Sequence, residues 1–193
     1  MRADAMSHYL DIHLRPDPEI TPHQLLSGLY ARLHRALVQL GSHDIGVSFP
    51  GHDDRKPGLG THVRLHAPME SLRALAATPW LNGLIDHLKL SDIKRVPDQV
   101  QYRQVMRVQA KSSPSRLRRR AMRRHGLDEE AAAQRIPDSA AEHLRLPYVV
   151  IGSRSTGQAS FPLFIRHGPL QQVPQAGTFN GYGLSQDATI PWF

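Results

Sequence analysis

The sequence predicts an α+β protein built from two parts. Residues 1–98 show the order strand, helix, strand, strand, helix, strand, which is the ferredoxin-like βαββαβ unit. Residues 99–193 follow a change of composition at Pro97 and Asp98, and we expect them to form a C-terminal α/β domain that contains an arginine-rich helix over residues 113–125. Apolar residues make up 40% of the chain, which is enough to bury a core.

The chain begins with a predicted strand and a predicted helix. Leu10, Ile12 and Leu14 alternate with polar residues, as expected for a half-buried strand. The segment "TPHQLLSGLYARLHRALVQLG" predicts a helix because Thr21 is a good N-cap, leucines recur on one stripe, and Gly41 can end the last turn.

The rest of the first part supplies two strands, a helix and a last strand. "DIGVSFP" and "THVRLHA" predict strands on either side of the polar loop "GHDDRKPGLG". "MESLRALAATPWLNGLIDHL" predicts a helix that breaks before Pro79, because proline cannot continue the backbone hydrogen bonding. "KLSDIKRV" predicts the final strand of the unit.

The second part begins with "YRQVMRVQAK", which predicts a strand with basic residues interleaved. In the next predicted helix Ser113 caps, Pro114 begins and Gly126 ends the element. "LDEEAAAQRI" predicts another helix, with acidic residues in its first turn as the helix dipole favours. The tail alternates short strand-like runs with turns rich in glycine and serine.

Positive charge is concentrated in one segment of the chain. The net charge is +7, yet Gln101 to His125 contains nine lysines and arginines and no acidic residue, so the other residues together carry about −2. Six of those arginines fall within nine positions. A concentrated basic patch of this kind is typical of nucleic-acid-binding proteins.

The predicted basic helix has five arginines on one face, at spacings of three and four residues: Arg116, Arg119, Arg120, Arg123 and Arg124. Like charges at these spacings repel, so a polyanion is the expected counter-charge. The apolar flank of Leu117 and Ala121 is too narrow for a membrane-surface or calmodulin-type helix. The pattern does not by itself distinguish RNA from DNA.

Several other classes of protein fit the sequence poorly. The chain has no cysteine, so it has neither disulfides nor thiolate metal sites, and a reducing intracellular setting is expected. No apolar run approaches the length of a membrane span, and the N-terminus has no secretion-signal pattern.

The twelve histidines do not predict a metal site. His62 and His66 are four residues apart, but on a strand this spacing separates them by about 13 Å, which is too far for one ion. No histidine pair has a carboxylate at a recognisable metal-binding spacing, so we expect neither a metal nor a cofactor.

Four residues are candidates for chemistry. His34 lies on the flank of the leucine stripe of its helix, where it can face the second part of the chain; a single such histidine is more often structural than catalytic. Ser153 and Ser155 follow the strand-like run "YVVI", and taken alone they are ordinary turn serines. Tyr182 lies between two glycines that permit a close backbone approach by a ligand.

Eight segments taken together, in this order and at these spacings, resemble the CRISPR-associated repeat-processing endoribonuclease of type I-F systems. The resemblance runs from about Ser7 to Phe193, through "HYLDIHLRPDPE", "LHRALV", "IGVSFP", "YRQVMRVQAKSSPSRLRRRAMRRH", "STGQ", "LFIRHGPL", "YGLS" and "PWF". It implies metal-independent cleavage of CRISPR precursor RNA at the base of the repeat hairpin. In this reaction a ribose 2′-hydroxyl attacks the adjacent phosphate and leaves a 2′,3′-cyclic phosphate and a 5′-hydroxyl.

The resemblance also implies partners and a location. The enzyme stays on the product hairpin and joins the other subunits of the type I-F surveillance complex, with no membrane involved, in the prokaryotic cytoplasm. The fold that it implies is a ferredoxin-like N-terminal half and a C-terminal RNA-binding half that carries the basic helix.

Roles for single residues follow from the resemblance by position. His34 matches the catalytic base, Ser153 the serine that holds the scissile ribose, and Tyr182 the tyrosine that orients the histidine. Arg107 and Gln109 match the pair that recognises base-pair edges at the bottom of the stem, and Phe161 matches the aromatic that stacks on the terminal base pair. The remaining expected RNA contacts are Arg116, Arg119, Arg120, Arg123, Arg124, His125 and Ser155.

Two other functions are compatible with the residues alone. The chain is a non-catalytic RNA-hairpin-binding protein if His34 is merely structural. It is a DNA-binding module if the basic helix enters a B-form major groove.

Overall fold

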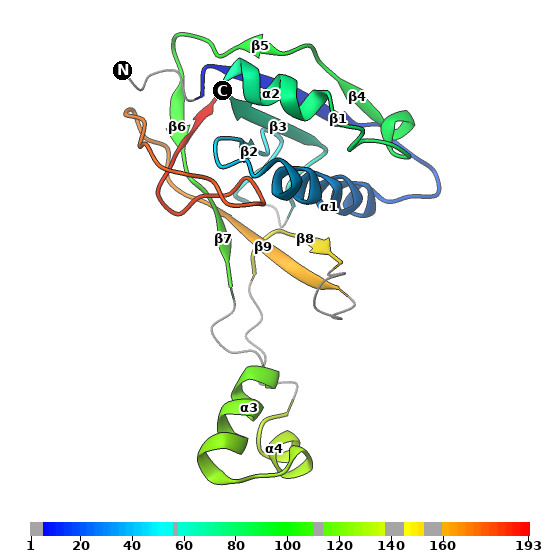
Figure 1. Ribbon diagram of the computed structural model, residues 1–193, viewed down its shortest axis with the longest axis vertical. Helices are drawn as coiled ribbons and strands as arrows, with labels where there is room; N and C mark the ends of the chain where they lie inside the picture. Colours follow the sequence, from blue (N-terminus) through cyan, green and yellow to red (C-terminus); the bar gives the residue numbers. More distant parts are fainter. Residues whose placement is uncertain (1–5, 56–57, 110–113, 138–144, 153–159) are drawn as a thin grey trace. The chain divides into compact units, whose positions relative to one another are not determined.

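The computed structural model describes residues 6–55, 58–109, 114–137, 145–152 and 160–193. It is a mixed α+β structure with antiparallel sheets (Figure 1). These residues contain four α-helices. The chain forms two compact units. The first comprises Met1–Arg107 and Leu146–Phe193, and the second comprises Val108–Arg145.

The first unit contains a five-stranded antiparallel sheet. Its order is β2-β3-β1-β4, and β5 pairs with the N-terminal end of β1. Ile12 on β1 pairs with Val63 on β3 and with Leu90 on β4, which fixes the register of the central strands. The strands are β1 (His8–Leu14), β2 (Gly46–Ser48), β3 (His62–Ala67), β4 (Leu88–Leu90) and β5 (Lys94–Arg95).

Two helices pack on one face of this sheet: α1 (Pro22–Leu40) and α2 (Met69–Ala76). The predicted caps of α1 are confirmed, because Thr21 forms a capping box with Gln24, and Gly41 ends the helix with a φ of 61°. The leucine stripe of α1 is buried in the core. Among the residues described, no helix is both long and apolar enough to cross a membrane.

The second helix breaks before Pro79 as predicted, but no α-helix follows the break among the described residues of this segment, and the predicted last strand is divided into two. The α2 helix ends at Ala76, before Pro79, and a short 3₁₀ turn (Ile85–His87) follows. The segment "KLSDIKRV" forms β4 and β5, which are separated by three residues and both pair with β1.

The C-terminal residues of the first unit extend its core. One pair consists of β6 (Gln101–Arg103) and β10 (Ile190–Trp192), and a three-stranded sheet in the order β7-β9-β8 consists of β7 (Val105–Val108), β8 (Tyr148–Ile151) and β9 (Phe161–His167). The buried residues Val149, Leu163 and Ile190 belong to the same core as the leucines of α1. The position after Asp98, where the composition changes, therefore lies inside the first unit.

The polar loop between β2 and β3 is fastened to the C-terminal strands. The Asp54 carboxylate accepts two hydrogen bonds from Nη2 of Arg103, at 2.8 and 2.9 Å, and Arg103 Nε donates to the Gly168 carbonyl. These hydrogen bonds from Arg103 lower the pKa of Asp54. The loop thus has a structural role that the sequence did not reveal.

The second unit is a pair of helices: α3 (Pro114–His125) and α4 (Glu129–Arg135). Gly126 ends α3 with a φ of 62°, as predicted, and Asp128 caps α4 through the Ala131 amide. Arg118 donates from Nε to the Ile136 carbonyl at 2.8 Å, so this arginine joins α3 to α4.

A buried histidine makes the stability of the fold sensitive to acid. His66 on β3 is fully buried, and its Nε2 bonds to the Ser48 hydroxyl at 2.9 Å. Burial lowers the pKa of His66 to about 3, and the charge of Arg64 acts in the same direction. The imidazole of an unfolded chain has a pKa of about 6.5, so between about pH 6.5 and pH 3 only the unfolded chain binds a proton at His66.

The contribution of His66 to the free energy of unfolding is therefore complete above about pH 6.5 and falls by about 1.4 kcal/mol per pH unit between about pH 6.5 and pH 3. His66→Gln should flatten the loss of stability between about pH 7.5 and pH 5, as measured by urea unfolding. The matched control, His23→Gln, changes an exposed histidine and should follow the wild type. An unaltered pH dependence in His66→Gln would contradict the assignment.

Candidate active site

His34 is placed by two contacts with the C-terminal part of the first unit. Its Nδ1 lies 2.7 Å from the carbonyl oxygen of Gly181, 147 residues away in the sequence. Its ring stacks on Tyr182, with centroids 4.0 Å apart and an interplanar angle of 12°. The expectation that His34 faces the second half of the chain is confirmed by these contacts.

The hydrogen bond to Gly181 sets the position of the imidazole proton. A carbonyl oxygen only accepts, so Nδ1 of His34 donates and carries the proton. In the neutral ring Nε2 then holds a lone pair, and no partner for it is found among the residues that the structure describes. His34 is half-buried on the flank of α1. Its Nε2 can accept a proton because the lone pair lies on this nitrogen.

The two glycines around Tyr182 are required by packing against the protein itself. A Cβ on Gly181 would lie 3.0 Å from Val38 Cγ2 and 3.6 Å from His34 Nδ1. Gly183 has a φ of 69°, and a Cβ there would approach Val47 Cγ2 to 2.4 Å. The close backbone approach that these glycines permit is to α1 and β2.

Tyr30 also holds the turn that contains Tyr182. Its side chain is fully buried, and its hydroxyl donates to the Tyr182 carbonyl at 2.7 Å. Burial raises the pKa of Tyr30, which keeps the hydroxyl protonated as a donor. Tyr30 and His34 are one helical turn apart, so α1 holds the Tyr182 turn at two points.

Tyr30→Phe is expected to destabilise the protein by about 1 kcal/mol, because the Tyr182 carbonyl loses its donor. If the chain cleaves RNA as the resemblance implies, loss of this support should also slow single-turnover cleavage by about fivefold without changing the Kd for RNA. Tyr148→Phe removes an exposed hydroxyl and is the control, with no effect expected on either measurement. A Tyr30→Phe variant with wild-type stability and rate would show that the bond does not position the turn.

Arg107 lies close to both Tyr182 and Phe161. The guanidinium carbon of Arg107 is 5.3 Å from the centroid of the Tyr182 ring and 5.8 Å from that of Phe161. The Arg107 carbonyl accepts a hydrogen bond from Nε2 of Gln186. The structure therefore joins four predicted site residues, from α1, β7, β9 and the C-terminal turn, into one cluster with a charged and an aromatic surface.

The other predicted site residues fall in three groups. Ser153 and Ser155 lie outside the described residues, so their roles stay predictions. Gln109 is exposed and belongs to the second unit. The remaining predicted RNA contacts are exposed side chains on α3, namely Arg116, Arg119, Arg120, Arg123, Arg124 and His125.

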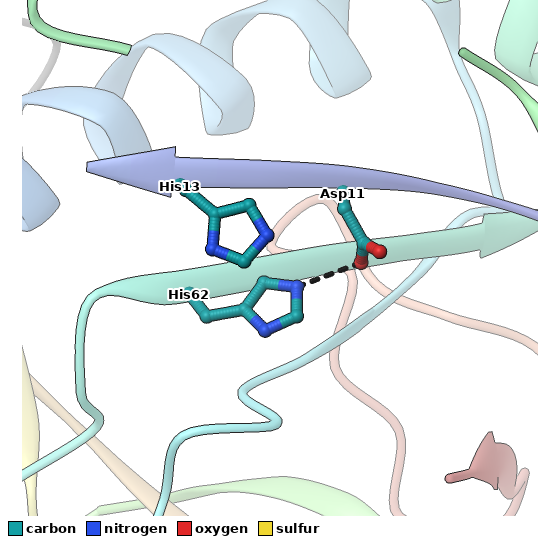
Figure 2. Close-up of side chains that lie close together, drawn as sticks. All are labelled: Asp11, His13 and His62. Atoms are coloured by element: carbon teal, nitrogen blue, oxygen red, sulfur yellow. Dashed lines mark hydrogen bonds and ion pairs between the residues drawn. The ribbon is translucent and has the colours of Figure 1, made fainter. Parts of the chain in front are cut away.

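A separate cluster of potential metal ligands lies on the sheet. Figure 2 shows Asp11 and His13 of β1 next to His62 of β3, and one ligand atom of each lies within 4.8 Å of the others. His13 and His62 are partners across the two strands, and their rings stack at 4.0 Å. A sequence pattern relates His62 only to neighbours on its own strand, such as His66, so this cross-strand pair was not predicted.

The carboxylate of this cluster already has a cationic partner. Arg64 holds both oxygens of Asp11, at 2.6 and 3.1 Å, and His62 Nε2 bonds to the same carboxylate at 2.7 Å. Burial of Asp11 opposes its ionisation, but these hydrogen bonds outweigh it and lower its pKa. A metal ion would compete with Arg64 for Asp11, so we assign the cluster to stabilisation of the β1–β3 pair.

Comparison with known proteins places the chain among CRISPR-associated proteins. The family described as "CRISPR-associated protein (Cas_Csy4)" matches residues 9–193. A protein of Pseudomonas aeruginosa (strain UCBPP-PA14) named "CRISPR-associated endonuclease Cas6/Csy4" is 57% identical over 188 residues, which are 97% of this chain and 100% of that protein. A protein of the same name from Escherichia coli (strain UTI89 / UPEC) is 45% identical over the same shares of both chains.

The match covers the His34 cluster, the basic helix and the C-terminal turn, and it confirms the resemblance found in the sequence. The chain belongs to the Cas_Csy4 family of CRISPR-associated proteins.

Proposed function

We propose that the protein is a metal-independent endoribonuclease that cuts CRISPR precursor RNA at the base of the repeat hairpin. The observation that carries the proposal is the fixed imidazole of His34, which donates from Nδ1 to Gly181 and keeps Nε2 for a substrate proton. The relatives named as CRISPR-associated endonucleases support the same activity.

The reaction needs no nucleophile from the protein, because RNA supplies one. His34 Nε2 takes the proton of the 2′-hydroxyl, and the oxygen attacks the adjacent phosphorus. The new P–O2′ bond forms as the P–O5′ bond breaks, and the departing O5′ takes up a proton from the protonated His34 or from water. The products are a 2′,3′-cyclic phosphate and a 5′-hydroxyl, and neither a metal nor a cofactor is required.

The cluster around His34 positions the reacting groups. Tyr182 holds the plane of the imidazole by stacking on it, and Ser153 holds the scissile ribose. Phe161 stacks on the terminal base pair of the stem, and Arg107 and Gln109 bind base edges there. Ser155 contributes a further contact to the RNA.

The exposed arginines of α3 grip the stem through its phosphates, together with His125. The uniform sign of this face supports a polyanionic ligand, since a face stabilised by its own side chains mixes charges. Because of these phosphate contacts the protein stays bound to the product hairpin. The protein and its RNA then join the other subunits of the type I-F complex in the prokaryotic cytoplasm.

Two features of the fold are part of the same interpretation. We interpret the sheet of β1 to β4 with α1 and α2 as the ferredoxin-like unit expected from the sequence. We assign RNA binding mainly to residues 99–193, although the strands among them share the core of the first unit.

A repeat-hairpin RNA incubated with the protein in EDTA tests the proposal. The expected result is a single cut at the base of the stem, and end-group analysis should find the cyclic phosphate. A 2′-deoxy substitution at the scissile nucleotide should abolish the cut and leave the Kd nearly unchanged, because only the nucleophile is removed. Binding without any cut would favour a non-catalytic RNA-binding protein, and equally tight binding of a DNA hairpin would favour the DNA-binding alternative.

A further inference from the structure

A second basic surface lies on α1, away from the His34 cluster. A groove of about 490 Å³ runs between α1 and the segment that follows α2. Its lining includes Arg32, Arg35 and Gln39 from the helix, and Trp80 and Asn82 from the segment. No carboxylate lines it, in contrast to the hollow beside Asp44 at the C-terminal end of the same helix.

The charge of this groove is not neutralised by its surroundings. Arg35 is exposed and has no acidic partner among the described residues. Arg32 donates from Nη1 to the Gly28 carbonyl, and its Nη2 would lie 3.8 Å from a Cβ on Gly83, so its guanidinium sits at the edge of the groove. The whole of α1 contains no acidic residue, so the charged side chains on its exposed side are all basic.

The groove and His34 are connected around the exposed side of α1. At 100° per residue, Arg35 follows His34 by one step, and Arg32 lies about 60° further in the same direction. This path avoids the buried leucine stripe and passes Val38, which is 59% exposed. Around a helix about 10–12 Å wide it measures roughly 15 Å, a length that about four stacked nucleotides cover at 3.4 Å each.

We propose that this groove, which we name the Arg35 groove, binds the single-stranded RNA on the 3′ side of the cut. This inference rests on the proposed function, because His34 marks the position of the scissile phosphate. The strand 3′ of that phosphate is covalently attached to it and leaves the site beside Arg35. The hairpin on the other side of the phosphate stays with the arginines of α3.

The chemistry of the Arg35 groove suits a single strand without sequence preference. Its two guanidinium groups match phosphates, and the partly exposed Trp80 ring offers a face on which a base can stack. The amides of Gln39 and Asn82 can pair with base edges of any sequence. The groove would therefore hold the substrate before the cut and release the leaving strand after it.

Binding of uncleavable hairpins tests this inference. All RNAs carry a 2′-deoxy nucleotide at the scissile position. One RNA ends at the cut, a second extends about eight nucleotides beyond it on the 3′ side, and a third has an extension of the same length on the 5′ side of the hairpin. The 3′ extension should lower the Kd about tenfold, in line with one stacked base and one charge contact. Arg35→Glu should remove this gain and leave the affinity for the hairpin without extension unchanged.

Arg15→Glu is the matched control, since Arg15 is an exposed arginine outside the groove, and it should keep the full gain. Trp80→Leu, which keeps an apolar side chain against the core, should reduce the gain by removing the stacking face. No gain from the 3′ extension would overturn the inference. If the 3′ extension still increases the affinity of Arg35→Glu, the inference is also overturned, because the groove then does not bind this strand.

A gain from the 5′ extension alone would contradict the assignment of the strand. Failure of the hairpin without extension to bind would instead contradict the proposed function, so the two failures are distinguishable.

Discussion

The His34→Ala variant is expected to cleave the repeat hairpin about 10²–10⁴-fold more slowly than the wild-type protein and to bind it with unchanged affinity. The reason is the loss of Nε2 of His34, the proposed proton acceptor. The hydrogen bond from Nδ1 to the Gly181 carbonyl leaves the lone pair on Nε2. Single-turnover cleavage and filter binding on the same RNA measure the two quantities separately.

The control for this variant lies on the same helix. His23 is exposed near the start of α1, where its Nε2 lies 3.2 Å from the Tyr148 carbonyl, far along the helix from Tyr182. His23→Ala should cleave at the wild-type rate. Cleavage at that rate in His34→Ala would falsify the assignment of the general base.

The pH dependence of cleavage gives a second readout. A protonated imidazole has no lone pair, so the rate of the wild-type protein should fall as the solution becomes more acidic. His34→Ala should lose this dependence within the pH range where the fold is stable. This measurement separates a proton acceptor from a residue that only supports the Tyr182 turn.

Replacing both Arg119 and Arg123 with alanine should weaken hairpin binding by about 10²-fold or more, because in the proposed function each arginine contributes a charge-assisted contact to phosphate. The two are four residues apart on α3, so they lie on one face, and both side chains are exposed. The dependence of log Kd on log salt should become shallower by about one unit per lost contact. Titrations at several salt concentrations measure both effects.

Two comparisons make this result specific. Arg73→Ala removes an exposed arginine from α2 and should change neither the Kd nor the salt slope. Arg118→Ala should instead loosen the packing of α3 on α4, because its guanidinium bonds to the Ile136 carbonyl. An unaltered salt slope in the double variant would show that α3 does not contact phosphates.

Much of the local structure could be predicted from the sequence. The Thr21 cap, the leucine stripe and Gly41 defined α1 within a residue at each end, because helix ends and faces depend on contacts of three and four residues. The alternation of Leu10, Ile12 and Leu14 predicted β1 for a similar reason. The segment after β4 was harder, since its pairing with β1 is not visible in a local pattern.

The candidate site was predicted only as separate residues. The contacts of His34 with Gly181 and Tyr182 join positions about 147 residues apart, and no local spacing encodes such a pair. The closeness of Arg107 to Tyr182 and the formation of the Arg35 groove likewise depend on how strands and helices pack. Ser153 and Ser155 remain predictions of the resemblance.

The sequence by itself determined the family, the helices and strands that short-range sterics and hydrogen bonds dictate, and the concentration of charge in one segment. Only the tertiary structure decided which nitrogen of His34 carries the proton, why Asp54 is tied to Arg103, and that the chain beyond Asp98 completes the core of the first unit. The physical reason is that these features depend on side chains that meet through the packing of distant elements, whereas a sequence pattern reports only the preferences of neighbours.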